Sequence, residues 1–97
     1  MTEKDARKEL IRRANELSPT VHVGKDGLDQ GIYDEITAQL KKNRLIKVKV
    51  LSNSDEGAKE IAAAIEENTG AIIVDVRGGV AIVTDKRTWT SLSQKKF

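Results

Sequence analysis

Residues 20–31 read TVHVGKDGLDQG, which predicts a short β-branched strand, a glycine loop and the start of a helix. Glycine lets the backbone adopt positive φ and approach a ligand closely. The free N–H groups at the start of a helix favour an anion. We therefore expect the loop residues Gly24, Lys25, Asp26 and Gly27 to hold phosphate. A purely structural turn that leads into a helix is the alternative interpretation.

The residues before and after this loop have the periodicity of helices. Apolar side chains recur every three or four positions in residues 2–17, which predicts an amphipathic helix that Pro19 ends. Asp29 has the side chain of an N-cap, and a second helix should run from it to about Asn43. The loop is therefore expected to connect a strand to a helix.

The second half of the chain predicts three strands and one more helix. Residues 45–51 alternate apolar side chains with lysine, as in a strand with one wet face. Ser54 is expected to cap a helix that Gly70 ends. Two strands then flank Gly78-Gly79, which suits a two-residue hairpin.

The predicted order is α-β-α-β-α-β-β, an α/β two-layer sandwich with a four-stranded mixed sheet and the helices chiefly on one face. Ile72, Val74 and Val76 should share the apolar face of the sheet. We expect one domain over residues 1–84 and a basic C-terminal tail over residues 85–97. The tail is either mobile or laid back over the sheet, with Trp89, Leu92 and Phe97 as its anchors.

The charges occur in blocks, although the net charge is only +2. Residues 41–49 contain several cations and no acid, and basic patches of this kind suit a polyanion. KH domains clamp nucleic-acid backbone with a Gly-x-x-Gly loop, so RNA is the first polyanion to test. At the end of the second helix we expect RNA contacts, although cations there also stabilise the helix end. On the polar sheet face we expect electrostatic contacts that are largely blind to sequence, because that face lacks the aromatic side chains that stack on bases. The two sets are Lys41, Lys42 and Arg44, and Lys47, Lys49 and Arg77.

Loop, helix and strand occur together in an order that resembles a known family. The stretch from Val23 to Ile32, followed by Glu35-Ile36 and by the strand sequence LIKVKV, is similar to the CRM domain in its single-domain YhbY-like form. The resemblance covers about residues 5–84 and departs from the family at Asp29, where members often have threonine.

The resemblance implies a fold similar to the C-terminal domain of translation initiation factor three. It also implies an RNA-binding domain whose Gly-x-x-Gly loop contacts RNA, and a role in assembly of the large ribosomal subunit. The expected partner is ribosomal RNA or a large-subunit precursor.

The sequence offers little for an enzyme, a metal or a cofactor. His22 is the only histidine, cysteine is absent, and neither the dinucleotide fingerprint nor the Walker loop occurs. We expect no enzyme activity, no metal and no cofactor, and a cytoplasmic monomer without a membrane segment. Two alternatives stay open: an adaptor that docks another protein, and an enzyme that uses the loop as a phosphate site in a deep pocket.

Overall fold

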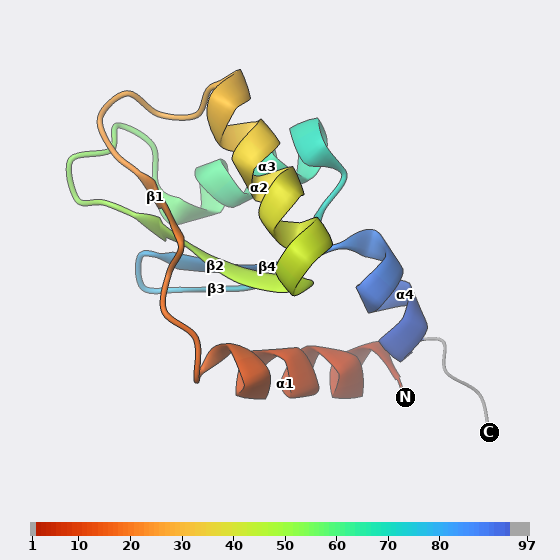
Figure 1. Cartoon of the computed structure of the whole chain (residues 1–97). Coiled ribbons are helices and arrows are strands. Elements are labelled where there is room, and N and C mark those ends of the chain that lie inside the picture. The colour runs from red at the N-terminus through yellow and green to blue at the C-terminus, as the bar shows by residue number, and fades with distance from the viewer. Residues whose placement is uncertain (1, 94–97) are drawn as a thin grey trace.

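The computed structural model describes residues 2–93 and places helices on both faces of one sheet (Figure 1). The sheet order is β1-β2-β4-β3, with β1 parallel to β2 and the other pairs antiparallel. The predicted α/β fold with a four-stranded mixed sheet is confirmed, and the chain adds an eighth element, helix α4. The elements are α1 (Glu3–Ala14), β1 (Val21–Val23), α2 (Gln30–Asn43), β2 (Leu45–Val50), α3 (Ala58–Thr69), β3 (Ile72–Arg77), β4 (Val80–Thr84) and α4 (Lys86–Ser93).

Most helix ends follow from local hydrogen bonding. Asp29 caps α2 as predicted, because its side chain accepts from the backbone N–H of Ile32 at 2.9 Å. Gly70 ends α3 in the left-handed conformation, also as predicted. The prediction that Ser54 caps α3 is wrong. Its hydroxyl donates to the carbonyl of Glu56 within the preceding loop, and α3 begins after Gly57.

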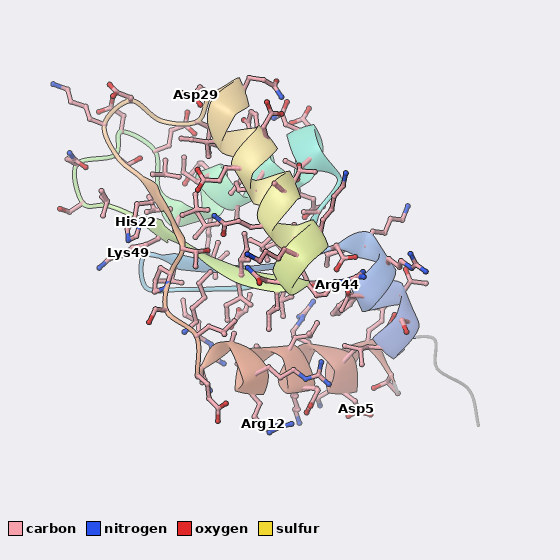
Figure 2. The ribbon with its side chains drawn as sticks, viewed as in Figure 1. Asp5, Arg12, His22, Asp29, Arg44 and Lys49 are labelled. Atoms are coloured by element: carbon pink, nitrogen blue, oxygen red, sulfur yellow. The ribbon has the colours of Figure 1, made fainter. Side chains whose placement is uncertain are left out.

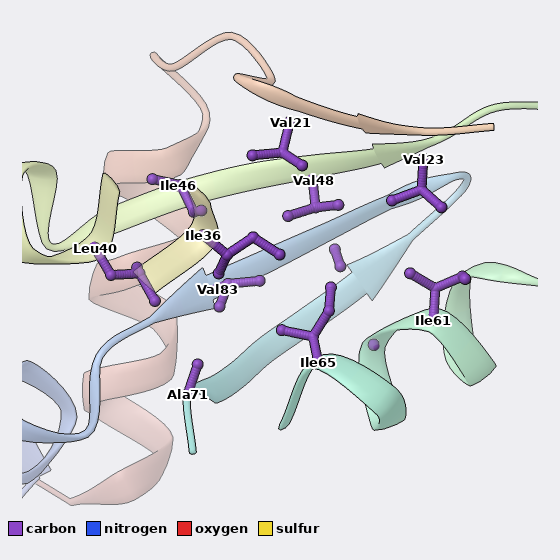
Figure 3. Close-up of a cluster of buried hydrophobic side chains, with 12 residues drawn as sticks. Val21, Val23, Ile36, Leu40, Ile46, Val48, Ile61, Ile65, Ala71 and Val83 are labelled. Atoms are coloured by element: carbon purple, nitrogen blue, oxygen red, sulfur yellow. The ribbon is translucent and has the colours of Figure 1, made fainter. Parts of the chain in front are cut away.

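The larger core lies between the sheet and helices α2 and α3 (Figure 3). Branched side chains of β1 and β2 pack there against the apolar stripes of the two helices. The same buried cluster therefore includes residues from both the parallel and the antiparallel parts of the sheet. Its buried members are Val21, Val23, Ile36, Leu40, Ile46, Val48, Ile61, Ala62, Ile65, Ala71, Ala81 and Val83.

A second core lies on the opposite face, beneath α1 and α4 (Figure 1). Leu10 of α1 is 1% exposed there, and Trp89 and Leu92 of α4 pack against the same cluster. The helices therefore cover both faces, and the expectation that they lie chiefly on one face is wrong, because the apolar stripes of α1 and α4 bury themselves against Val74 and Ile82 on the face that was expected to be open. Of the residues assigned to a tail, 86–93 form α4, whereas Phe97 lies outside the described residues.

Strand β3 departs from simple alternation. The register with β4 shifts between Ile73 and Asp75, which leaves Val74 as an extra residue. Val74 packs in the core beneath α1, whereas Val76 packs against the larger core. The prediction that Ile72, Val74 and Val76 share one face is therefore wrong, because one inserted residue reverses the facing of those that follow.

The second core should contribute strongly to stability. Replacing Leu10 with alanine removes a fully buried side chain and should lower the free energy of unfolding by about 2–5 kcal/mol. Leu17→Ala is the matched control, because Leu17 is 41% exposed and its loss should cost about 0.5 kcal/mol or less. Urea denaturation of both variants measures the difference. Equal stabilities would contradict the claim that the packing of α1 through Leu10 stabilises the fold.

Candidate nucleic-acid interface

The glycine loop forms a tight turn directly after β1. The N–H of Gly27 donates to the carbonyl of Gly24 at 3.0 Å, and Gly27 has a φ of 69°. Lys25 and Asp26 are exposed at the tip. The turn brings its backbone, one cation and one anion to the surface, and a phosphate contact at this loop stays a prediction.

The segment that follows β2 holds this loop in place. The N–H of Leu51 donates to the carbonyl of Val23 at 2.8 Å, which extends the pairing of β1 and β2 by one residue. A Cβ built on Gly24 would lie 3.4 Å from Oδ1 of Asn53. The loop therefore rests against the connection between β2 and α3, and a Cβ at Gly24 would make an ordinary van der Waals contact with that connection.

The start of α2 is already occupied by a carboxylate. Because Asp29 accepts from Ile32, it satisfies one of the N–H groups that an anion could otherwise use, and it adds a negative charge. An anion at the loop thus meets Lys25 and the loop backbone rather than a free helix end. The sequence predicted that the N–H groups at the start of α2 would also attract the anion, and the Asp29 cap weakens this contribution.

The face of the sheet that α1 and α4 cover in part carries a row of basic residues beside the loop, His22, Lys49 and Arg77, which we call the sheet row. His22 pairs in register with Lys49, Lys49 with Val80, and Val80 with Arg77, so the row crosses all four strands. The three basic side chains are exposed, and Figure 2 shows His22 and Lys49 next to each other. Arg77 also forms an ion pair with Asp75, which reduces its free charge.

Lys47 has a structural contact that the sequence did not indicate. Its Nζ donates to the carbonyl of Leu17 at 3.0 Å and so ties the end of α1 to β2. An ammonium group has three donors, so two remain for a ligand. Lys47 therefore lies on the expected face but is committed in part to holding α1.

The basic run lies at the end of α2 that is farther from the glycine loop. Figure 2 shows Arg44 and Asp29 at opposite ends of this helix. Arg44 ends α2 with a φ of 68°, its carbonyl accepts from the Thr84 hydroxyl at 2.7 Å, and its guanidinium lies 3.8 Å from the Asp85 carboxylate. Lys41 and Lys42 are exposed in the last turn.

Helix α4 adds cations that sequence reasoning missed. A hollow at the ends of α2 and α3 is lined by four basic residues, Lys41, Arg44, Lys86 and Arg87, which we call the Arg44 cluster, and by one acidic residue, Asp85. The pair Lys86-Arg87 is visible in the sequence, but only the fold of α4 places it beside α2. The predicted site residues thus form three groups, the loop, the sheet row and the end of α2, rather than one patch.

Other kinds of site find no support in the described part of the chain. Among residues 2–93, no three His, Cys, Asp or Glu side chains are grouped as a metal would require. Within the same residues, no helix has the length and apolar character to cross a membrane. A hollow beside Gly78-Gly79 is lined by Asp55 and Glu56, whose charges disfavour an anion.

The chain thus has a glycine loop between its first strand and its second helix, on an α/β domain with grouped surface cations. The family model described as the CRS1 / YhbY (CRM) domain matches residues 1–83, and the chain belongs to this family.

Known relatives have similar lengths. The chain is 30% identical over 74 residues to the "Probable RNA-binding protein YqeI" of Bacillus subtilis, covering 76% of this chain and 77% of that one. It is 36% identical over 70 residues to an "RNA-binding protein" of Haemophilus influenzae, covering 72% and 71%. The solution structure of the hypothetical protein SAV1595 from Staphylococcus aureus superposes with a TM-score of 0.73 at 28% identity, covering 89% and 90%. Both curated names refer to binding and not to a reaction, in agreement with the prediction that the chain is not an enzyme.

The conformation of Arg44 can be tested through stability. A left-handed backbone costs a residue other than glycine roughly 1 kcal/mol. Arg44→Gly should therefore have a free energy of unfolding about 1 kcal/mol higher than Arg44→Ala, although both variants lose the same charge and the same ion pair. Urea denaturation compares them, and equal stabilities would show that this position is unstrained.

Proposed function

We propose that this protein binds structured ribosomal RNA by its phosphate backbone and assists assembly of the large ribosomal subunit, acting as a cytoplasmic monomer. The observation that carries the proposal is the position of the Gly24–Gly27 turn. It lies at the end of β1, whose His22 is in register with Lys49. The loop backbone, Lys25 and the sheet row can therefore contact successive phosphates of one RNA.

The proposed contacts read shape more than sequence. The described aromatic side chains, Tyr33 and Trp89, pack against the two cores, so neither offers a free ring beside the sheet row. Contacts to phosphate position a protein on RNA but carry little sequence information. The relatives named for RNA binding support the partner class, and the family resemblance supports the ribosomal setting.

Salt dependence separates this function from a protein adaptor. Phosphate contacts release counterions, so log affinity should fall linearly with log salt concentration. A protein interface with a buried apolar centre should respond less. The basic groups at the loop, the sheet row and the Arg44 cluster predict the steep response.

The loop contact can be tested with two variants of Gly27 whose side chains have the same shape but differ in charge. Asparagine and aspartate both tolerate positive φ, so Gly27→Asn and Gly27→Asp should lose similar stability, about 1 kcal/mol each. A carboxylate beside phosphate adds repulsion of about 1 kcal/mol, so Gly27→Asp should bind RNA about fivefold more weakly than Gly27→Asn.

Filter binding or fluorescence anisotropy with ribosomal RNA fragments measures the affinities of the Gly27 variants, and thermal melting checks their folding. If both folded variants bind as tightly as the wild type, the loop does not approach phosphate.

The ribosomal setting predicts co-sedimentation. In lysate fractionated at low salt, the protein should travel with large-subunit precursor particles, and raised salt or ribonuclease should release it. Sequencing of crosslinked RNA identifies the partner directly. A protein that stays at the top of the gradient and crosslinks mainly to transfer or messenger RNA would refute the assembly role but leave RNA binding intact.

A further inference from the structure

A groove of about 440 Å³ opens between α1, the start of β1 and the end of α2. Its volume falls within the range of roughly 300–1,000 Å³ typical of pockets for small organic groups. The residues that line it include Leu10, Arg13, Leu17, Asn43, Arg44 and Ile46.

The groove has an apolar interior and a polar rim. Leu10, Leu45 and Ile46 are buried core residues that supply the interior, and Leu17 remains 41% exposed. Asn43 offers both donors and an acceptor at the rim.

The electrostatics of the groove favour an anion attached to the group that fills it. A smaller hollow continues from it and is lined by Arg13, Arg44 and Arg87. None of the described residues that line either hollow is acidic. An apolar interior beneath three guanidinium groups fits a flat base whose phosphate lies outside.

The arginines keep donors for such a ligand. Nε of Arg13 lies 3.1 Å from Glu9, whose pKa is lowered by its hydrogen bond from Arg12, so Glu9 is ionised and neutralises part of this charge. Arg44 lies 3.8 Å from Asp85. A guanidinium has five N–H donors. Arg13 is paired through Nε and Arg44 approaches Asp85 through one terminal nitrogen, so both keep N–H groups that can bind phosphate.

We propose that this groove receives one unpaired nucleotide of the bound RNA, with its base against Leu17 and the interior and its phosphate on Arg44 and Arg87. The proposal rests on the proposed function and adds a contact to the base itself. It also makes RNA with an unpaired nucleotide the preferred ligand.

The groove and the glycine loop lie along one edge of the sheet. Thr20, at the groove, precedes β1, and Gly24 of the loop follows it. The three residues of β1 span about 10 Å at roughly 3.3 Å each. One strand of RNA that follows this edge reaches both sites within a few nucleotides, since stacked nucleotides rise about 3.4 Å each.

Adenosine and uridine 5′-monophosphates are the probes for the groove, with inorganic phosphate and the free nucleosides as controls at matched ionic strength. Amide resonances of residues 18–20 and 43–46 should shift and saturate at millimolar nucleotide, and the controls should shift them less. If inorganic phosphate reproduces the shifts, the groove binds anions without the base. If nothing binds, the groove serves another purpose, such as docking an apolar side chain of a protein.

Leu17→Asp and Leu17→Asn test the groove within the intact protein. Both changes are at an exposed position and have similar size, so circular dichroism should show both folded. The carboxylate should weaken mononucleotide binding, and binding of a randomised single-stranded RNA 20-mer, about tenfold more than the amide does.

The outcomes separate the two proposals. Gly27→Asp should still bind mononucleotides at the groove, because the loop lies at the far end of β1. If the wild type binds RNA but Leu17→Asp and Leu17→Asn have equal affinities, the nucleotide groove is refuted and RNA binding stands. If the wild type binds no RNA in the gradient or in the filter assay, the proposed function fails whatever the groove does.

Discussion

The pairing of β2 with a neighbour on each side is the constraint on which the rest of the structure depends. It is parallel to β1 and antiparallel to β4, so its register places both neighbours. Ile46 and Val48 enter the larger core and Leu45 the second core, whereas Lys49 is left at the surface. One strand thus supplies both hydrophobic layers and part of the basic surface, and a register shift by one residue would exchange them.

Much of this arrangement could be predicted because it is local. The alternation of residues 45–50 reflects a strand with two unlike faces, and Asp29 caps α2 through a bond three residues away. The loop conformation also follows locally, since Gly27 adopts the positive φ that glycine permits. In these places the chain's short-range preferences agree with the final fold.

The features that could not be predicted arise from contacts distant in sequence. Helix α4 has few apolar residues of its own, and Trp89 and Leu92 find their partners on α1 and the sheet. The extra residue in β3 is accommodated by β4, which no periodicity within β3 reveals. The Arg44 cluster and the groove likewise need α1, α2 and α4 to meet, so their residues looked unrelated in the sequence.

The bulge at Val74 also affects how copies of this chain meet in a crowded solution. β3 is an edge strand of six residues, and a regular edge of this kind offers unpaired backbone groups to any other strand. The extra residue interrupts that regular row, and the ion pair of Asp75 and Arg77 adds charge beside it. At the opposite edge β1 is only three residues long, between Pro19 and Gly24. Both edges are therefore poor templates for strand addition, which protects the protein against aggregation without a partner to cover it.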